Sequence, residues 1–254
     1  AKLTGYFINK SDILYLGSTL KISEKSQILS KIFTDHLQIL SLFSFFSVNI
    51  PNYFKVPLLL SGNSLSLTSK SIDCFFSQFQ NLKPLWFYQI IWSLLLPIFL
   101  FAFYLTLGLL LLLLKKNNII LKYRNTAFIF IYLYFFPTVV SLLSRSLNCI
   151  QIGDESYLDL DFNIKCFDPE NHLPYMIYFS IPILFVWIIV IPLLIFLKIR
   201  NGKLKQWSIF TEIKYSIIFA GHKEKFYYWE FGKLAYKSII IINSILFQQN
   251  LLYK

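Results

Sequence analysis

Three cysteines are the residues of this chain best suited to covalent chemistry. Cys149 and Cys166 flank one short stretch, and Cys74 stands far upstream of both. A disulfide between Cys149 and Cys166 would close a short, hairpin-like excursion and would stabilise it. The alternative is three reduced thiols, kept inert by apolar surroundings. If the first pairing holds, Cys74 bonds a cysteine outside this sequence; otherwise it bonds one of the other two.

The stretch between Cys149 and Cys166 is rich in carboxylates. It contains Asp154, Glu155, Asp159 and Asp161. Several acids in one loop raise the local concentration of cations, so we expect a cation-attracting loop here.

The spacing of these acids invites comparison with a calcium loop. Asp159, Asp161, Asn163 and Glu170 fall at positions 1, 3, 5 and 12 of that pattern. Its sixth position requires glycine and here holds Ile164. We therefore interpret the match as chance and predict no metal site.

A second set of charged residues opens the last apolar run. Lys233 and Lys237 are four residues apart, share a helix face and could extend to lipid headgroups. Tyr228 and Trp229 are typical of an aromatic belt at a membrane surface. Membrane anchoring does not explain Glu230. We expect Glu230 to pair with Lys233, with Lys237 or with a basic residue on a neighbouring span.

Patterns typical of enzymes are missing from the sequence. There is no glycine-rich phosphate loop, no histidine pair with metal spacing and no nucleophile elbow. The histidines His36, His172 and His222 stand singly at segment ends, where we interpret them as polar boundary residues. We predict that the protein is not an enzyme and that it has no cofactor.

The composition indicates the kind of protein in which these residues are held. Of 254 residues, 56% are hydrophobic and only 15% are charged, against about 25% charged in soluble domains. The net charge of +11 is spread between apolar runs, so we expect no nucleic-acid partner. The sequence predicts an integral membrane protein whose main partner is the lipid bilayer.

Five stretches are apolar enough for membrane helices, which need about 20 such residues. We expect spans at 32–50, 85–114, 126–147, 173–197 and 231–252, so that 32–252 forms one all-α, polytopic helical bundle. Span 32–50 could instead be an interfacial helix. Prolines fall inside the spans at Pro97, Pro137, Pro182 and Pro192. Such prolines bend helices, and the bends serve either gating or packing.

The distribution of charge predicts the orientation of the spans. Loop 148–172 holds one lysine and six acids, whereas residues 1–31 hold five lysines and two acids. Basic loops stay in the cytoplasm. We therefore expect the juxtamembrane segment 1–31 and the loops 115–125 and 198–230 to be cytoplasmic. Loops 51–84 and 148–172 then lie outside.

The sequence begins at Ala1 without an initiator methionine and stops soon after an apolar run. We therefore expect it to be part of a longer polypeptide.

Four stretches together carry a resemblance to a known group of proteins. They are "TDHLQILSLFSFFSVNIPNYF", "SLTSKSIDCFF", "FPTVVSLLSRSLNCIQIGDESYLDLDFNIKCF" and "FAGHKEKFYYWEFGKLAYK". In this order they resemble the multi-span C-terminal domain of large ciliate, oomycete and algal surface proteins that are described as similar to transient receptor potential (TRP) channels. The likeness covers about residues 30 to 247. His222 stands where that group usually has tyrosine, and Tyr236 precedes Lys237 where an Arg-Lys pair is common.

The resemblance implies a membrane module that follows a long extracellular region in a plasma or ciliary membrane. It implies further spans or an ectodomain on the same polypeptide, which offers a partner for Cys74, and other membrane subunits as neighbours. It makes Glu230 and Lys237 motif positions without giving them a task. The function that we expect first is a channel-like domain. The alternative is a non-conducting anchor or scaffold subunit, which the scarcity of polar residues in the spans favours.

Overall fold

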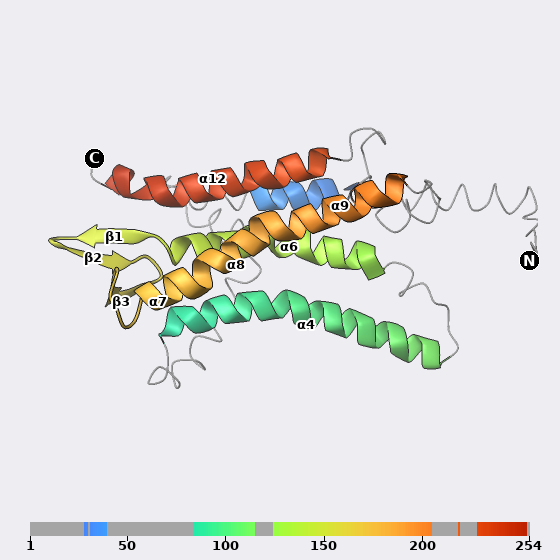
Figure 1. Cartoon of the computed structure of the whole chain (residues 1–254), viewed down its shortest axis with the longest axis horizontal. Helices are drawn as coiled ribbons and strands as arrows, with labels where there is room; N and C mark the ends of the chain where they lie inside the picture. Colours follow the sequence, from blue (N-terminus) through green and yellow to red (C-terminus); the bar gives the residue numbers. More distant parts are fainter. Residues whose placement is uncertain are drawn as a thin grey trace, which may run out of the picture.

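The computed structural model describes residues 28, 29, 31–39, 84–114, 124–204, 218 and 228–252. Most of these residues are helical. The long helices are α4 (Leu85–Leu113), α6 (Arg124–Arg145) and α12 (Trp229–Leu252), and a further helix covers residues 31–39. Figure 1 shows them lying along one axis, with a small sheet at one end. Successive long helices alternate in direction, as short connections between spans require.

Three helices are long and apolar enough to cross a bilayer. They are Leu85–Leu113, Arg124–Arg145 and Leu173–Asn201. The predicted spans 85–114, 126–147 and 173–197 coincide with them. α12 runs beside α6 and has 24 residues, but its polar side chains keep it out of this set. The fifth predicted span, 32–50, falls within the described residues only at its start. The structure thus supports three membrane-crossing helices where the sequence predicts five.

The core of the bundle is built on α6. Four of its apolar residues recur at helical spacing and are buried: Ile129, Tyr132, Phe136 and Val140. They pack against Leu234, Ile241 and Ile245 of α12 and against Ile195 and Ile199 of the neighbouring helix. α4 contacts α6 on another side and leaves large apolar side chains exposed along its length. Apolar exposure on that scale fits contact with lipid rather than with water.

The third apolar helix is not a regular α-helix. It consists of α7 (Leu173–Tyr175), η3 (Met176–Ser180), α8 (Ile181–Phe185), η4 (Val186–Val190) and α9 (Ile191–Leu204), where η3 and η4 are π-helical turns. Each π-turn ends just before an Ile-Pro pair, at Pro182 and at Pro192. A proline lacks the N–H of the α-helical pattern and its ring crowds the preceding turn. Widening that turn to a π-helix is one way to relieve the crowding.

The predicted all-α fold is wrong at one place, because the loop after α6 is a three-stranded sheet. Strands β1 (Cys149–Ile152), β2 (Glu155–Leu158) and β3 (Asp161–Lys165) pair antiparallel in the order β1-β2-β3. Gly153 takes a φ of 65° between β1 and β2, a conformation that glycine adopts without strain. Leu158 turns toward the bundle and is buried against Trp86 and Val139. We call β1 to β3, with the turn that follows to residue 172, the cap.

Candidate functional site

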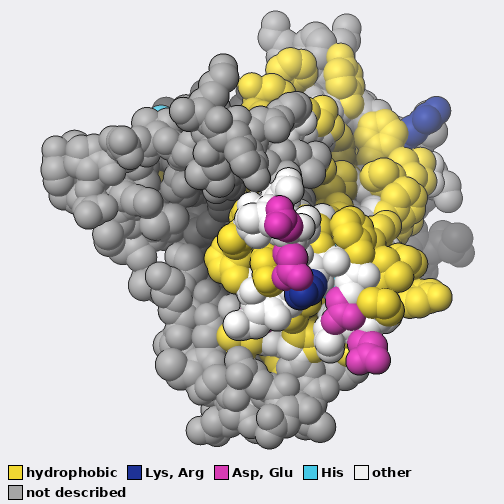
Figure 2. Space-filling model, turned by 90° about the vertical axis from the view of Figure 1, so that its left-hand side faces the viewer, with side chains coloured by type: hydrophobic (Ala, Val, Ile, Leu, Met, Phe, Trp, Pro, Cys, Tyr) yellow, Lys and Arg dark blue, Asp and Glu magenta, His cyan; other side chains and the backbone are white. Residues whose placement is uncertain are grey.

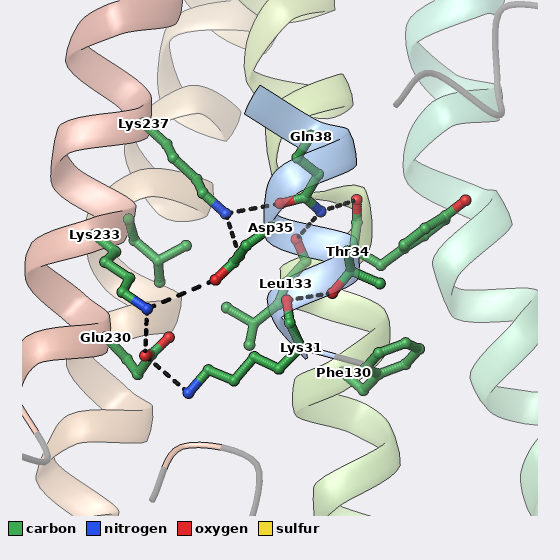
Figure 3. Close-up of a pocket in the computed structure, with 11 residues that line it drawn as sticks. Lys31, Thr34, Asp35, Gln38, Phe130, Leu133, Glu230, Lys233 and Lys237 are labelled. Carbon is green, nitrogen blue, oxygen red and sulfur yellow. Dashed lines mark hydrogen bonds and ion pairs between the residues drawn. The ribbon is translucent and has the colours of Figure 1, made fainter. Parts of the chain in front are cut away.

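Six charged or polar side chains meet where helix 31–39 lies against α12 and α6 (Figure 3). We call this set the charged clasp; it comprises Lys31, Asp35, Gln38, Glu230, Lys233 and Lys237. Each helix contributes three of them, at intervals of three or four residues, which places them on one helix face. Lys31, the first of its helix, pairs with Glu230, the first of α12. The last members of the two sets, Gln38 and Lys237, also pair. Helix 31–39 and α12 therefore run in the same direction.

Glu230 is the first carboxylate of the charged clasp. One of its oxygens, Oε1, lies 2.8 Å from Lys31 Nζ and 3.1 Å from Lys233 Nζ. The side chains of Lys31 and Glu230 are only 8% and 7% exposed. A buried charge is tolerated when it is paired, and deleting one partner strands the other. Glu230 also lies in the first turn of α12, where the helix dipole favours a negative charge.

Asp35 is the second carboxylate of the charged clasp and belongs to the other helix. Its Oδ1 accepts a hydrogen bond of 2.7 Å from Lys237, and its Oδ2 lies 3.6 Å from Lys233. Lys233 thus bridges Asp35 and Glu230. This bridge makes the ion pairs one connected network between two helices.

Gln38 joins the charged clasp to α6. Its side-chain oxygen accepts from Lys237 at 2.8 Å, and its Nε2 donates to the carbonyls of Leu133 and Tyr134 at 3.1 and 3.2 Å. The carbonyl of Leu133 would normally accept from the N–H four residues on, but that residue is Pro137, which has none. The amide of Gln38 supplies the hydrogen bond that the proline removes.

A second proline is compensated in the same manner, outside the charged clasp. In η4 the N–H of Ile191 bonds the carbonyl of Val186, which is the π-helical pattern. The next donor in that pattern would be Pro192, so the carbonyl of Trp187 loses its backbone partner. The hydroxyl of Tyr132 in α6 donates to that carbonyl at 2.7 Å. Side chains from neighbouring helices therefore satisfy the carbonyls that Pro137 and Pro192 leave open.

A small cavity of about 20 Å³ lies within the charged clasp. Its lining includes the clasp residues and, from α6, Phe130, Leu133 and Tyr134. Space of that size and polarity suits about one water molecule. The cavity is too small for a substrate, so the charged clasp is suited to holding helices together.

The cap forms one end of the bundle (Figure 1). Cys149 and Cys166 form the predicted disulfide, with their Cα atoms 6.0 Å apart. Nε of Arg145, in the last turn of α6, donates to Asp159 Oδ2 at 2.9 Å, and this aspartate side chain is 8% exposed. The disulfide closes the sheet, and the ion pair fixes the sheet to the helix. Cys74 lies outside the described residues.

The predicted cation-attracting acids are distributed over the cap. Asp159 is bound to Arg145, whereas Asp154 and Glu155 are exposed. Figure 2, which views the molecule from the cap end, shows acidic side chains beside a basic one among hydrophobic side chains. In the part of the chain that the structure describes, no three His, Cys, Asp or Glu side chains could hold one metal ion.

Two cap carboxylates have perturbed acidity. Hydrogen bonds from Lys165 and from the hydroxyl of Tyr157 lower the pKa of Glu155 below its usual value. Hydrogen bonds from the Asn171 side chain and the Glu170 N–H lower the pKa of Asp168 in the same way. Each shift follows from donors placed around the charged form of an exposed carboxylate. These contacts are local and rigidify the cap surface.

Several hydroxyl groups of the helices are bound to their own backbone. Ser93, Thr106, Ser238 and Ser244 each donate to a carbonyl three or four residues earlier in the same helix. A hydroxyl bonded in this way presents little polarity to its surroundings.

The sequence finds one half of the charged clasp and misses the other. Glu230, Lys233 and Lys237 are predicted site residues, and Glu230 pairs with Lys233 as well as with a lysine from another helix. Tyr228 and Trp229 are exposed, outside the ion pairs. The missed residues are Lys31, Asp35 and Gln38. Their spacing matches that of the α12 set, which is the signal that could have indicated a second face.

Comparisons with protein-family models, curated proteins and solved structures found no match for this chain.

Proposed function

We propose that this chain is a non-enzymatic membrane module that anchors or scaffolds a larger surface assembly. The observation that carries the proposal is that its strongest polar groups join one helix to another. The charged clasp joins helix 31–39, α12 and α6 through side chains that are largely buried. A conducting path would instead need polar groups that face a common channel.

The cap, at one end of the bundle, also supports an anchoring role. It is closed by a disulfide and fixed to α6 by the Arg145–Asp159 pair. A disulfide persists in an oxidising compartment, which suits a cap on the outer face and basic loops in the cytoplasm. In this proposal the membrane is a plasma or ciliary membrane. The module's partners are the lipid bilayer, an ectodomain or further spans of the same polypeptide, and other membrane subunits.

A channel-like, TRP-like role is the second candidate. It rests on the two π-turns, η3 and η4, since each provides a place where a membrane helix could bend. In this case the conducting path would be lined by several copies or by other parts of the polypeptide.

Reconstitution of the complete chain into liposomes distinguishes the two candidates. We expect no cation or anion flux above that of protein-free liposomes, while the cap stays accessible to a protease added on one side. A flux that depends on protein and changes in the Tyr132→Phe variant, which removes a hydrogen bond to η4, would contradict the anchor and support the channel. Thr106→Val, a change at an exposed hydroxyl of α4, is the matched control.

A further inference from the structure

His172 is a buried junction between three parts of the molecule, although its sequence position suggests a simple boundary residue. Its side chain has no exposed surface. Nδ1 lies 3.0 Å from the backbone nitrogen of Phe167 in the cap, and Nε2 lies 3.1 Å from the carbonyl oxygen of Ser146 just after α6. His172 itself begins the third apolar helix, immediately before α7.

The two partners fix the protonation state of the imidazole. A carbonyl oxygen only accepts, so Nε2 carries the hydrogen toward Ser146. A backbone N–H only donates, so Nδ1 is bare toward Phe167. The junction therefore requires the neutral imidazole. A proton on Nδ1 would set two N–H groups against each other and would place a cation in a buried site.

The contact that depends on Nδ1 holds a strained residue. Phe167 has a φ of 60°, in the left-handed region that bulky residues avoid. It directly follows Cys166 of the disulfide, and its ring packs edge-on to the imidazole. Surrounding structure must hold such a conformation. Loss of the bond to Nδ1 removes one of the contacts that hold it.

The junction also reaches the first π-turn. Ser146 Oγ lies 2.9 Å from Oγ of Ser180, the last residue of η3, and both residues are buried. A change at the imidazole therefore affects the cap, and it also affects Ser146, which contacts the third apolar helix.

Among the residues that the structure describes, few charged groups lie near the imidazole. α4 presents Trp86, whose ring centroid lies 6.2 Å away, and Tyr175 packs against the same indole. The cap turn presents Asp168, whose backbone carbonyl accepts from the N–H of His172. At the end of α6, Arg145 is bound to Asp159. Among the described neighbours, Asp168 is the carboxylate close to the imidazole, and no basic side chain is bonded to the ring.

We propose that His172 is a proton-sensitive latch that holds the cap to α6 and to the third apolar helix, and that acidification on the cap side opens it. Opening lets the imidazole take up one proton, so acidification shifts the equilibrium toward the open state. Uptake of one proton makes opening more favourable by at most about tenfold for each unit of pH. This inference does not depend on whether the module anchors or conducts.

Hydrogen exchange of the complete chain in lipid nanodiscs tests the latch. After correction for the intrinsic pH dependence of exchange, amides 162–172 should lose protection several-fold, and at most about tenfold, from pH 6.5 to pH 5.5, while α6 keeps its protection. His172→Gln retains an amide donor toward Ser146 and cannot titrate, so its exchange should not vary with pH. His36→Gln, at an exposed histidine of helix 31–39, is the control and should behave like the natural chain.

Two outcomes overturn the proposal. One is pH-independent protection of residues 162–172 in the natural chain. The other is an equal pH response in His172→Gln, which would assign the response to Asp168 or another carboxylate. If His172→Gln does not fold, nitrogen NMR of histidine-labelled natural chain replaces it. A protonated His172 signal in a chain whose amides 162–172 keep their protection would equally refute the latch.

Discussion

Midway along the bundle, Lys237 bonds Asp35 across 202 positions of the chain, whereas at one end Cys149 bonds Cys166 across 17 (Figure 1). The charged clasp is a long-range structure made of ion pairs that form only when two helices meet. The cap is a local structure, closed by a covalent bond and by hairpin pairing. The difference suggests that the clasp depends on the fold of the whole bundle, whereas the cap can keep its structure when helix contacts weaken.

The largest effect should come from removing the central carboxylate of the charged clasp. Glu230→Gln removes the negative charge that pairs with the buried Lys31, and deletion of one member of a buried pair costs about 3–5 kcal/mol. We expect a loss of about that size in the free energy of unfolding in mixed micelles. Glu170→Gln, at an exposed acid of the cap, is the control and should change the value by less than about 0.5 kcal/mol.

Opening the disulfide should have the next largest effect and should stay local. For Cys149→Ser with Cys166→Ser, the loop of about 17 residues predicts a loss of about 3 kcal/mol. The loss should appear as faster hydrogen exchange in β1 to β3, with the exchange of α12 unchanged. Equal acceleration in α12 would show that the cap and the charged clasp are not independent.

The contact between Gln38 and α6 should contribute less to the free energy of unfolding than the ion pairs or the disulfide, because it consists of hydrogen bonds to carbonyls. Gln38→Leu should cost about 1–2 kcal/mol in unfolding free energy. In a Pro137→Ala background the backbone regains an N–H for the carbonyl of Leu133, so the same change should cost less. An identical cost in both backgrounds would show that Gln38 does not compensate for the proline.

The smallest effect should be the response of the cap surface to acid. The pKa of Glu155 is lowered in the folded chain, so its ionised form stabilises the cap above its usual pKa of 4.5. This contribution is lost as the pH falls through the lowered value. Exchange of β2 amides should therefore accelerate below pH 4.5 in the natural chain. In Lys165→Met, which lacks the main donor, we expect a weaker acceleration.

Local patterns predicted the parts of this molecule that depend on neighbouring residues. The apolar runs around Leu85–Leu113 and Arg124–Arg145 have helix bounds within two residues of the predicted spans. The pairing of Cys149 with Cys166 was also correct, because both lie in one short loop. The strands between them were missed, since runs of four or five residues carry too little alternation to be recognised.

Long-range partners could not be predicted from the sequence. Glu230 allowed several pairings, and the choice of Lys31 depends on how helix 31–39 lies against α12. Pro137 signalled a missing hydrogen bond in α6 but gave no indication that Gln38 supplies it. His172 resembled a polar end residue because nothing local predicts its burial. In each case the missing information is the packing of distant segments.

The double-mutant cycle of Lys31 and Glu230 tests most directly whether the charged clasp holds the bundle together. Lys31→Met, Glu230→Gln and the double variant are each unfolded in mixed micelles, and the coupling is taken from the four free energies. Residues in one ion-pair network should have a coupling free energy of at least about 1 kcal/mol. The double variant should then lose less stability than the two single variants lose together. Additivity within about 0.5 kcal/mol would contradict the clasp.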